Sequence, residues 1–153
     1  MKRIIYFLCA IAIATLTSCS DDNDLAQVDV NIEISGITVV DNVLYTIEGE
    51  NVTLENTTVN SLTAQPAIIQ RVAYSLDYTL LLPEFGKPFT ASFSTEGLRI
   101  GKHLLGMEGV ILQVDKTLTP IRTQLPLIIV EKKEDLPENA PEIGTYTITI
   151  NGL

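Results

Sequence analysis

Apolar and polar residues alternate with a period of two through most of the chain after residue 27. In residues 28–35, valine and isoleucine occupy every even position, with polar residues between them. Such alternation predicts half-buried β-strands with one apolar face each. It recurs at 72–80, 89–93, 110–114, 125–129 and 145–150, and short strands are expected at 37–40, 43–47 and 52–54. No helical apolar spacing persists beyond the first nineteen residues, so we expect an all-β antiparallel sandwich of about seven to eight strands.

Turn-forming residues divide this alternation into expected strands. Gly36 is predicted to end the first strand, and Asp41-Asn42 is predicted to form a turn. The stretch of Thr, Asn and Ser that leads to Ala64 is expected to be a loop closed by Pro66. By contrast, residues 72–80 are expected to form one unbroken strand that ends before Pro83.

Glycine and proline residues within the expected strands indicate local irregularities. Gly106 and Gly109 lie in the middle of the strand expected from His103 to Val114, which indicates a bulge or a close backbone approach. Pro126 lies inside the strand expected at 125–129. Because proline has no N–H to donate to a neighbouring strand, its presence favours an edge position for that strand.

The C-terminal part of the chain has a different composition. Residues 131–142 are mostly charged and contain two prolines, which indicates an exposed linker, and residues 145–150 follow as an alternating strand. We therefore divide the mature chain into a sandwich at 27–131 and a linker with an extra strand at 132–153. That strand has three possible places: on a sheet edge, against residues 28–34, or in a partner protein.

The N-terminal stretch has the features of an export signal. Lys2 and Arg3 precede an apolar run that ends at Leu16. The run is shorter than the roughly 20 residues that a membrane-spanning helix needs, so a cleaved secretory signal is expected. Leu16-Thr17-Ser18-Cys19 resembles the lipobox of bacterial lipoproteins. The resemblance implies cleavage after residue 18 and a diacylglycerol on the Cys19 thiol; the alternatives are an ordinary signal peptide or an uncleaved anchor.

An acidic cluster follows this cysteine within the expected tether, residues 19–26. It resembles the surface-export signal of Bacteroidetes lipoproteins, and it comprises Ser20, Asp21, Asp22, Asn23 and Asp24. The resemblance implies an outer-membrane lipoprotein displayed at the cell surface; the alternatives are a solvated spacer and display on the periplasmic face. Two or three acyl chains on Cys19 suffice for stable attachment to the membrane.

Charge and cysteine content exclude several kinds of partner. The chain carries a formal net charge of −9, and loss of Lys2 and Arg3 with the signal makes the mature chain more acidic still. Such a chain does not favour nucleic acid or electrostatic binding to anionic lipid. Cys9 leaves with the signal and Cys19 is lipidated, so no thiol remains for a disulfide or a cysteine metal site. We expect no cofactor and no metal.

Three segments between Tyr45 and Glu131 resemble bacterial immunoglobulin-like modules. Residues 47–54 resemble the entry to the second strand of such domains, residues 72–77 resemble the central strand, and residues 88–105 resemble the corner between two later strands. The resemblance implies an immunoglobulin-like sandwich and is silent about function. The chain lacks the core Trp and the disulfide of many such domains, and it has His103 where a corner tyrosine is common.

Few residues are candidates for chemistry. His103, the only histidine, is either a base or metal ligand, or a corner residue that bonds to the backbone; we favour the second reading because no nucleophile or orienting acid is evident. Asp77 and Asp115 are oxygen donors of the kind calcium takes, but no calcium-loop motif is present. The tyrosines could stack on sugar. We expect Tyr74 and Tyr78 in the core and Tyr146 exposed.

These observations leave three classes of function. The first is a non-catalytic binding or interaction module, for glycan capture or as an adhesion accessory, with a protein or glycan partner. The second is a structural or fimbrial assembly subunit that uses its C-terminal strand. The third is an enzyme, which would need paired carboxylates or a triad that the sequence does not nominate.

Overall fold

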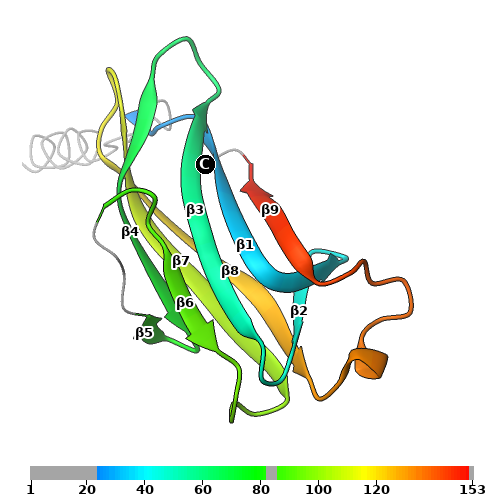
Figure 1. Cartoon of the computed structure of the whole chain (residues 1–153). Helices are drawn as coiled ribbons and strands as arrows, with labels where there is room; N and C mark the ends of the chain where they lie inside the picture. Colours follow the sequence, from blue (N-terminus) through cyan, green and yellow to red (C-terminus); the bar gives the residue numbers. More distant parts are fainter. Residues whose placement is uncertain (1–23, 82–85, 152–153) are drawn as a thin grey trace, which may run out of the picture.

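The computed structural model describes residues 24–81 and 86–151 and shows an all-β sandwich, as predicted (Figure 1). One turn of 3-10 helix lies at Lys133–Asp135. Within the described residues, no helix has the length and hydropathy of a membrane span. The strands are β1 Val28–Val40, β2 Val43–Ile47, β3 Asn51–Ser61, β4 Ala67–Leu76, β5 Thr79–Leu81, β6 Ala91–Ser94, β7 Gly101–Gln113, β8 Thr119–Val130 and β9 Gly144–Ile150.

The strands form two layers. Sheet 1 has the order β9-β1-β3-β6, and sheet 2 has the order β5-β4-β7-β8-β2. Neighbouring strands are antiparallel except β2 and β8, which pair in parallel. The even positions of β1 from Val28 to Ile34 are fully buried between the sheets, as their alternation predicts.

The strand β1 belongs to both sheets, and Gly36 makes this possible. Residues up to Ser35 pair with β3 and β9, whereas Thr38–Val40 pair with β2 in sheet 2. Gly36 has φ +79°, and a Cβ there would overlap the carbonyl oxygen of Asn51. The expected break at Gly36 is therefore a corner within a continuous strand, at a position that only glycine can occupy without strain.

The prediction of a loop in the residues that lead to Ala64 is wrong, because β3 continues to Ser61. Its threonines are β-branched and suit a strand despite their polarity. Thr57 points into the core, where its hydroxyl is hydrogen-bonded to the hydroxyl of Tyr74. Tyr74 is buried as expected; its burial raises the pKa of the phenol, and the hydrogen bond to Thr57 acts in the opposite direction.

The single strand expected at 72–80 is also wrong. Asp77 and Tyr78 have φ values of +47° and +67°, which form a two-residue hairpin turn between β4 and β5. Leu76 then faces Thr79 across the hairpin, so the apolar alternation does not continue through the turn. Tyr78 is consequently 71% exposed rather than in the core.

The prediction from Pro126 that its strand lies at a sheet edge is wrong, since this strand, β8, lies between β7 and β2. However, pairing with β2 begins only at Leu127, so at Pro126 the strand has a single neighbour, β7. The close backbone approach expected at the glycines of β7 is confirmed. A Cβ on Gly109 would lie 2.9 Å from the carbonyl oxygen of Arg71, and a Cβ on Gly106 would meet the hydroxyl of Ser75.

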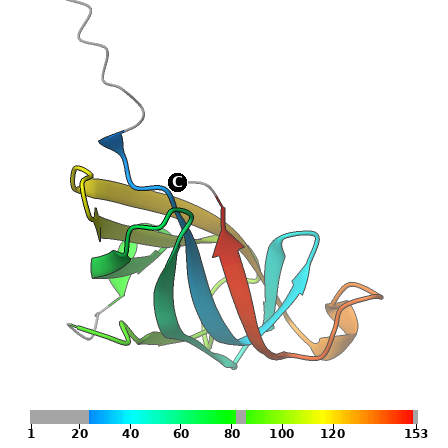
Figure 2. The ribbon, with the colours of Figure 1, turned by 90° about the horizontal axis from the view of Figure 1, so that it is seen from above.

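The C-terminal strand β9 takes the second of its three possible places. It pairs antiparallel with β1, from Val30 opposite Ile150 to Ile37 opposite Gly144, and Figure 2 shows β1 between β3 and β9. The inward side chains of β9 pack against the core but are only partly buried. Tyr146, expected to be exposed, is half-buried, and its hydroxyl donates to the carbonyl oxygen of Glu142 at 2.6 Å.

Candidate functional site

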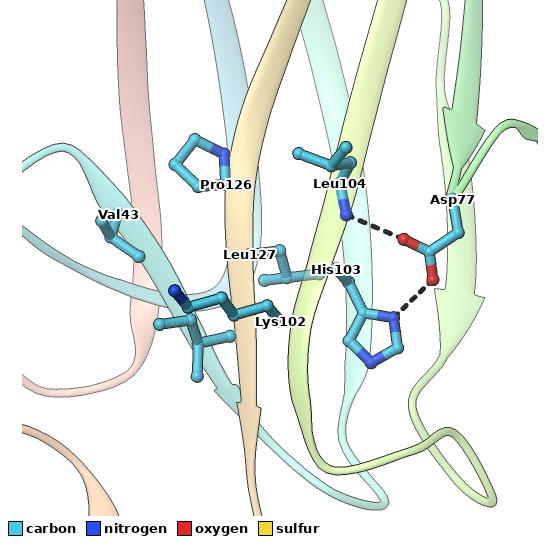
Figure 3. Close-up of a pocket in the computed structure, with 8 residues that line it drawn as sticks. Val43, Asp77, Lys102, His103, Leu104, Pro126 and Leu127 are labelled. Carbon is cyan, nitrogen blue, oxygen red and sulfur yellow. Dashed lines mark hydrogen bonds and ion pairs between the residues drawn. The ribbon is translucent and has the colours of Figure 1, made fainter.

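The outer face of sheet 2 carries hollows at two levels. The lower hollow, here called the corner pocket, has a volume of about 540 Å³ and is drawn in Figure 3. It lies where β7, β8 and the start of β2 meet the β4–β5 turn. Its wall is mostly apolar, and its lining residues are Val43, Asp77, Lys102, His103, Leu104, Pro126, Leu127 and Ile128.

A buried histidine and a turn aspartate lie at one side of the corner pocket (Figure 3). His103 Nδ1 lies 2.6 Å from Asp77 Oδ2, and His103 Nε2 lies 2.6 Å from the carbonyl oxygen of Arg99. Since a carbonyl only accepts, Nε2 is a donor, and the carboxylate accepts from Nδ1. The imidazolium form satisfies both contacts. The Leu104 N–H donates to Asp77 Oδ1 at 2.9 Å, which fixes the carboxylate in the turn.

The pKa of Asp77 reflects these contacts. Partial burial alone would raise the pKa of this carboxyl. The Leu104 N–H, the hydrogen bond and charge of His103 and the charge of Arg99 outweigh burial and hold the pKa below its ordinary value. The ion pair is therefore a stabilising feature of the corner between β7 and the β4–β5 turn.

The geometry matches the structural reading of His103. Both ring nitrogens are engaged, whereas a general base needs a free nitrogen directed at a substrate. Among the described residues, no group of three or more His, Cys, Asp or Glu side chains is arranged to hold a metal ion. Asp115 lies in the β7–β8 turn with φ +62°, far along β7 from His103 and Asp77.

The upper hollow, here called the Tyr78 hollow, consists of two adjoining depressions of about 190 and 710 Å³. Two small residues, Ala73 and Ser75, are among its lining residues. Tyr78 and Leu80, 71% and 60% exposed, lie at its β5 side. The depressions share the residues Ala73, Leu80, Glu108 and Arg122.

A charged pair crosses the Tyr78 hollow. Glu108 on β7 lies directly opposite Arg122 on β8, and Arg122 Nε is 2.9 Å from Glu108 Oε1. Both side chains are more than half exposed. An exposed pair of this kind contributes at most about 1 kcal/mol to folding, so its donors and acceptors can be redirected to a ligand at little cost.

The sequence did not indicate the Tyr78 hollow. Its residues come from four strands and the β4–β5 turn, and only the strand register places them together. The one available signal was Asp77 followed by Tyr78, because aspartate favours turns; reading these residues as a hairpin would have exposed Tyr78.

Most of the expected lipidation and export residues lie outside the described part of the chain: Cys19, Ser20, Asp21, Asp22 and Asn23. Asp24 is exposed, and its carbonyl oxygen accepts hydrogen bonds from the N–H and the hydroxyl of Thr117, both at 3.0 Å. Ala26 is already buried, so the chain joins the sandwich within two residues of Asp24.

Comparisons with known proteins add little to this description. No protein-family model matches the chain, and no curated protein matches it. Among solved structures, a similar chain comes from the fibronectin(III)-like modules of Clostridium thermocellum CbhA. It has 11% sequence identity and a TM-score of 0.37, over 65% of this chain and 99% of that one. The likeness is too remote to support an argument about function.

Proposed function

We propose that this protein is a lipoprotein anchored to the outer membrane through acyl chains on Cys19, with its sandwich displayed at the cell surface. The lipobox-like Leu16-Thr17-Ser18-Cys19 and the acidic residues behind it support this proposal. We expect labelled palmitate to be incorporated into the wild type and not into Cys19→Ala. Protease added to intact cells should remove the sandwich. A protected sandwich would place it on the periplasmic face instead.

The function that the geometry supports best is non-catalytic glycan binding in the Tyr78 hollow. The observation that carries it is the exposed ring of Tyr78 beside the Arg122–Glu108 pair. A tyrosine offers an apolar ring face and a hydroxyl, which suits the faces of sugar rings. A guanidinium and a carboxylate donate and accept hydrogen bonds with sugar hydroxyls. An open hollow with a few converging polar groups is the usual form of a binding site.

A glycan array with the full-length protein, followed by titration calorimetry on the best ligand, tests this function. Tyr78→Ala should weaken binding by about tenfold, the loss typical of a central aromatic contact. Tyr78→Phe keeps the ring and should stay within about threefold of the wild type. Glu96→Ala, an exposed substitution in the turn after β6, is the control. An array without ligands, or equal affinities for wild type and Tyr78→Ala, would refute glycan binding here.

A second candidate function is assembly through the C-terminal strand. The inward side chains of β9 are only partly buried, whereas those of β1 are fully buried. A linker of mostly charged residues precedes the strand. Such a strand could exchange into a second molecule at low cost. If deletion of residues 143–153 leaves a stable monomer and intact surface assemblies, this function is excluded.

A further inference from the structure

Exposed apolar side chains gather at the end of the sandwich where the tether enters. Eight large hydrophobic side chains among the described residues are at least 44% exposed, and five of them belong to this end. They come from the lead into β1, the β3–β4 loop with the start of β4, and the β7–β8 loop, all at the upper end in Figure 1. The five residues are Leu25, Leu62, Ile68, Val114 and Leu118.

One buried side chain fixes the segments that carry these residues. Gln113, only 5% exposed, donates its amide N–H groups to Ser61 and Thr63 hydroxyls at 2.9 Å, and its carbonyl oxygen accepts from the Gln27 N–H at 2.9 Å. Thr119 accepts from the Ala26 N–H at 2.8 Å. The exposed apolar side chains are therefore presented by segments that the structure holds in place.

The charges of the two ends differ. We call residues 24–27, 62–68 and 114–118 the anchor end; they include two acidic residues and one basic residue. We call residues 48–50, 95–100 and 131–143 the far end; they include eight acidic residues and three basic residues. An anionic leaflet repels the far end, whereas the anchor end has little charge and its approach to lipid has a smaller electrostatic cost.

The tether is too short to separate the anchor end from the membrane. Only residues 20–23 lie between Cys19 and Asp24. Even fully extended, the chain from Cys19 to Asp24 spans at most about 17 Å. The interfacial layer of one leaflet, about 5–8 Å thick, occupies roughly a third of that distance. Acyl chains on Cys19 would therefore keep Leu25, Leu62 and Leu118 within reach of the lipid headgroups.

We infer that the anchor end docks on the bilayer that holds Cys19, with its exposed leucines in the interfacial layer. This inference rests on the proposed lipid anchor. Apolar side chains that enter the headgroup and upper acyl region lose contact with water, and each adds binding energy to that of the acyl chains. Docking would hold the sandwich upright, with the far end directed away from the membrane and the Tyr78 hollow facing sideways, open to ligands.

The chain contains no tryptophan, which makes a direct test possible. Full-length Leu118→Trp and Leu62→Trp variants would be expressed with their leader and reconstituted into vesicles of phosphatidylethanolamine and phosphatidylglycerol. Ile100→Trp, at an exposed position of the far end, is the matched control. Circular dichroism melts show whether each variant folds, and Val114→Trp replaces any that does not. Acyl-brominated lipid then quenches indoles that enter the bilayer.

We expect brominated lipid to quench the L118W and L62W indoles at least about twofold and to leave the I100W indole unchanged. Protein that floats with the vesicles but shows equal quenching at all three positions overturns docking and leaves the anchor intact. Protein that does not float overturns the anchor and docking together. The L118W indole could instead be shielded from water in a way that depends on protein concentration and not on brominated lipid. That result would assign this end to contact with a second copy of the chain and would also overturn the proposal.

Discussion

The anchor end and the far end of the sandwich satisfy their buried polar groups by different means. At the anchor end, the amide of Gln113 connects the lead into β1 with the β3–β4 loop. At the far end and in the strands that lead to it, buried threonine hydroxyls donate to backbone carbonyls: Thr95 to Ile47 at 2.8 Å and Thr46 to Gly36 at 2.8 Å. The corner of β1 at Gly36, next to these strands, depends on backbone conformation.

This difference bears on what each end can do. At the anchor end a single amide with several partners joins the lead into β1 to the β3–β4 loop, and these segments carry little charge. The far end distributes its contacts over several residues and carries eight acidic residues, against two at the anchor end. The anchor end is therefore suited to present a fixed apolar surface, and the far end to remain in water.

The largest effect is expected from Gly36→Ala, which tests the backbone corner. The new Cβ would overlap the Asn51 carbonyl in a strained conformation, so we expect a loss of about 4 kcal/mol or more in the free energy of unfolding. Gly49→Ala is the matched control: φ is +87° there, but no heavy atom lies within 4 Å of an added Cβ. Its cost should be about 1 kcal/mol. Equal costs in urea unfolding would show that β1 does not depend on this corner.

Gln113→Ala should have the next largest effect, at the anchor end. It leaves the Gln27 N–H and the Ser61 and Thr63 hydroxyls without their amide partner, and we expect a loss of about 2–3 kcal/mol. Limited proteolysis should also begin in residues 62–66. Gln124→Ala, an exposed substitution on β8, should change neither measurement. If Gln113→Ala left both unchanged, the anchor end would be held by contacts other than this amide.

His103→Ala should cost less, about 1–2 kcal/mol, since it removes the donor to the Arg99 carbonyl and the partner of a half-exposed carboxylate. The melting temperature of the full-length protein measures the loss. Lys102→Ala, at the exposed neighbouring position, is the control and should be nearly neutral. A neutral His103→Ala would mean that the corner is held by the Leu104–Asp77 backbone and side-chain bonds alone.

The sequence predicted the parts of this fold that depend on local periodicity. Alternation placed Val30 and Ile32 in the core because a strand exposes every second residue to the same layer. It failed where polar residues face inward, as at Thr57, and where a hairpin without glycine interrupts the pattern, as at Tyr78. The Tyr78 hollow and the Gln113 contacts depend on register between distant strands, which the alternation of a single strand does not specify.

The smallest expected effect is the pH dependence that Asp77, in the β4–β5 turn, contributes to the free energy of unfolding. The folded pKa of Asp77 is lowered, so its charged form stabilises the fold above the unfolded value of about 3.9. This stability is lost as pH falls through the lower, folded pKa. Urea midpoints of wild type and Asp77→Asn should therefore differ most near neutral pH and converge as the pH falls through the lowered pKa of Asp77.

The His103→Ala background separates the causes of this pH dependence. In that background the difference between Asp77 and Asp77→Asn should shrink but not vanish, because the Leu104 N–H still donates to Asp77 Oδ1. If the difference were unchanged, the charge of His103 would contribute nothing to the ion pair. If it vanished, the backbone donor would contribute nothing, although the Leu104 N–H lowers the pKa of Asp77 more than the hydrogen bond from His103 does. Either result would show that only one of the two contacts of Asp77, with His103 or with the Leu104 N–H, stabilises this side of the corner pocket.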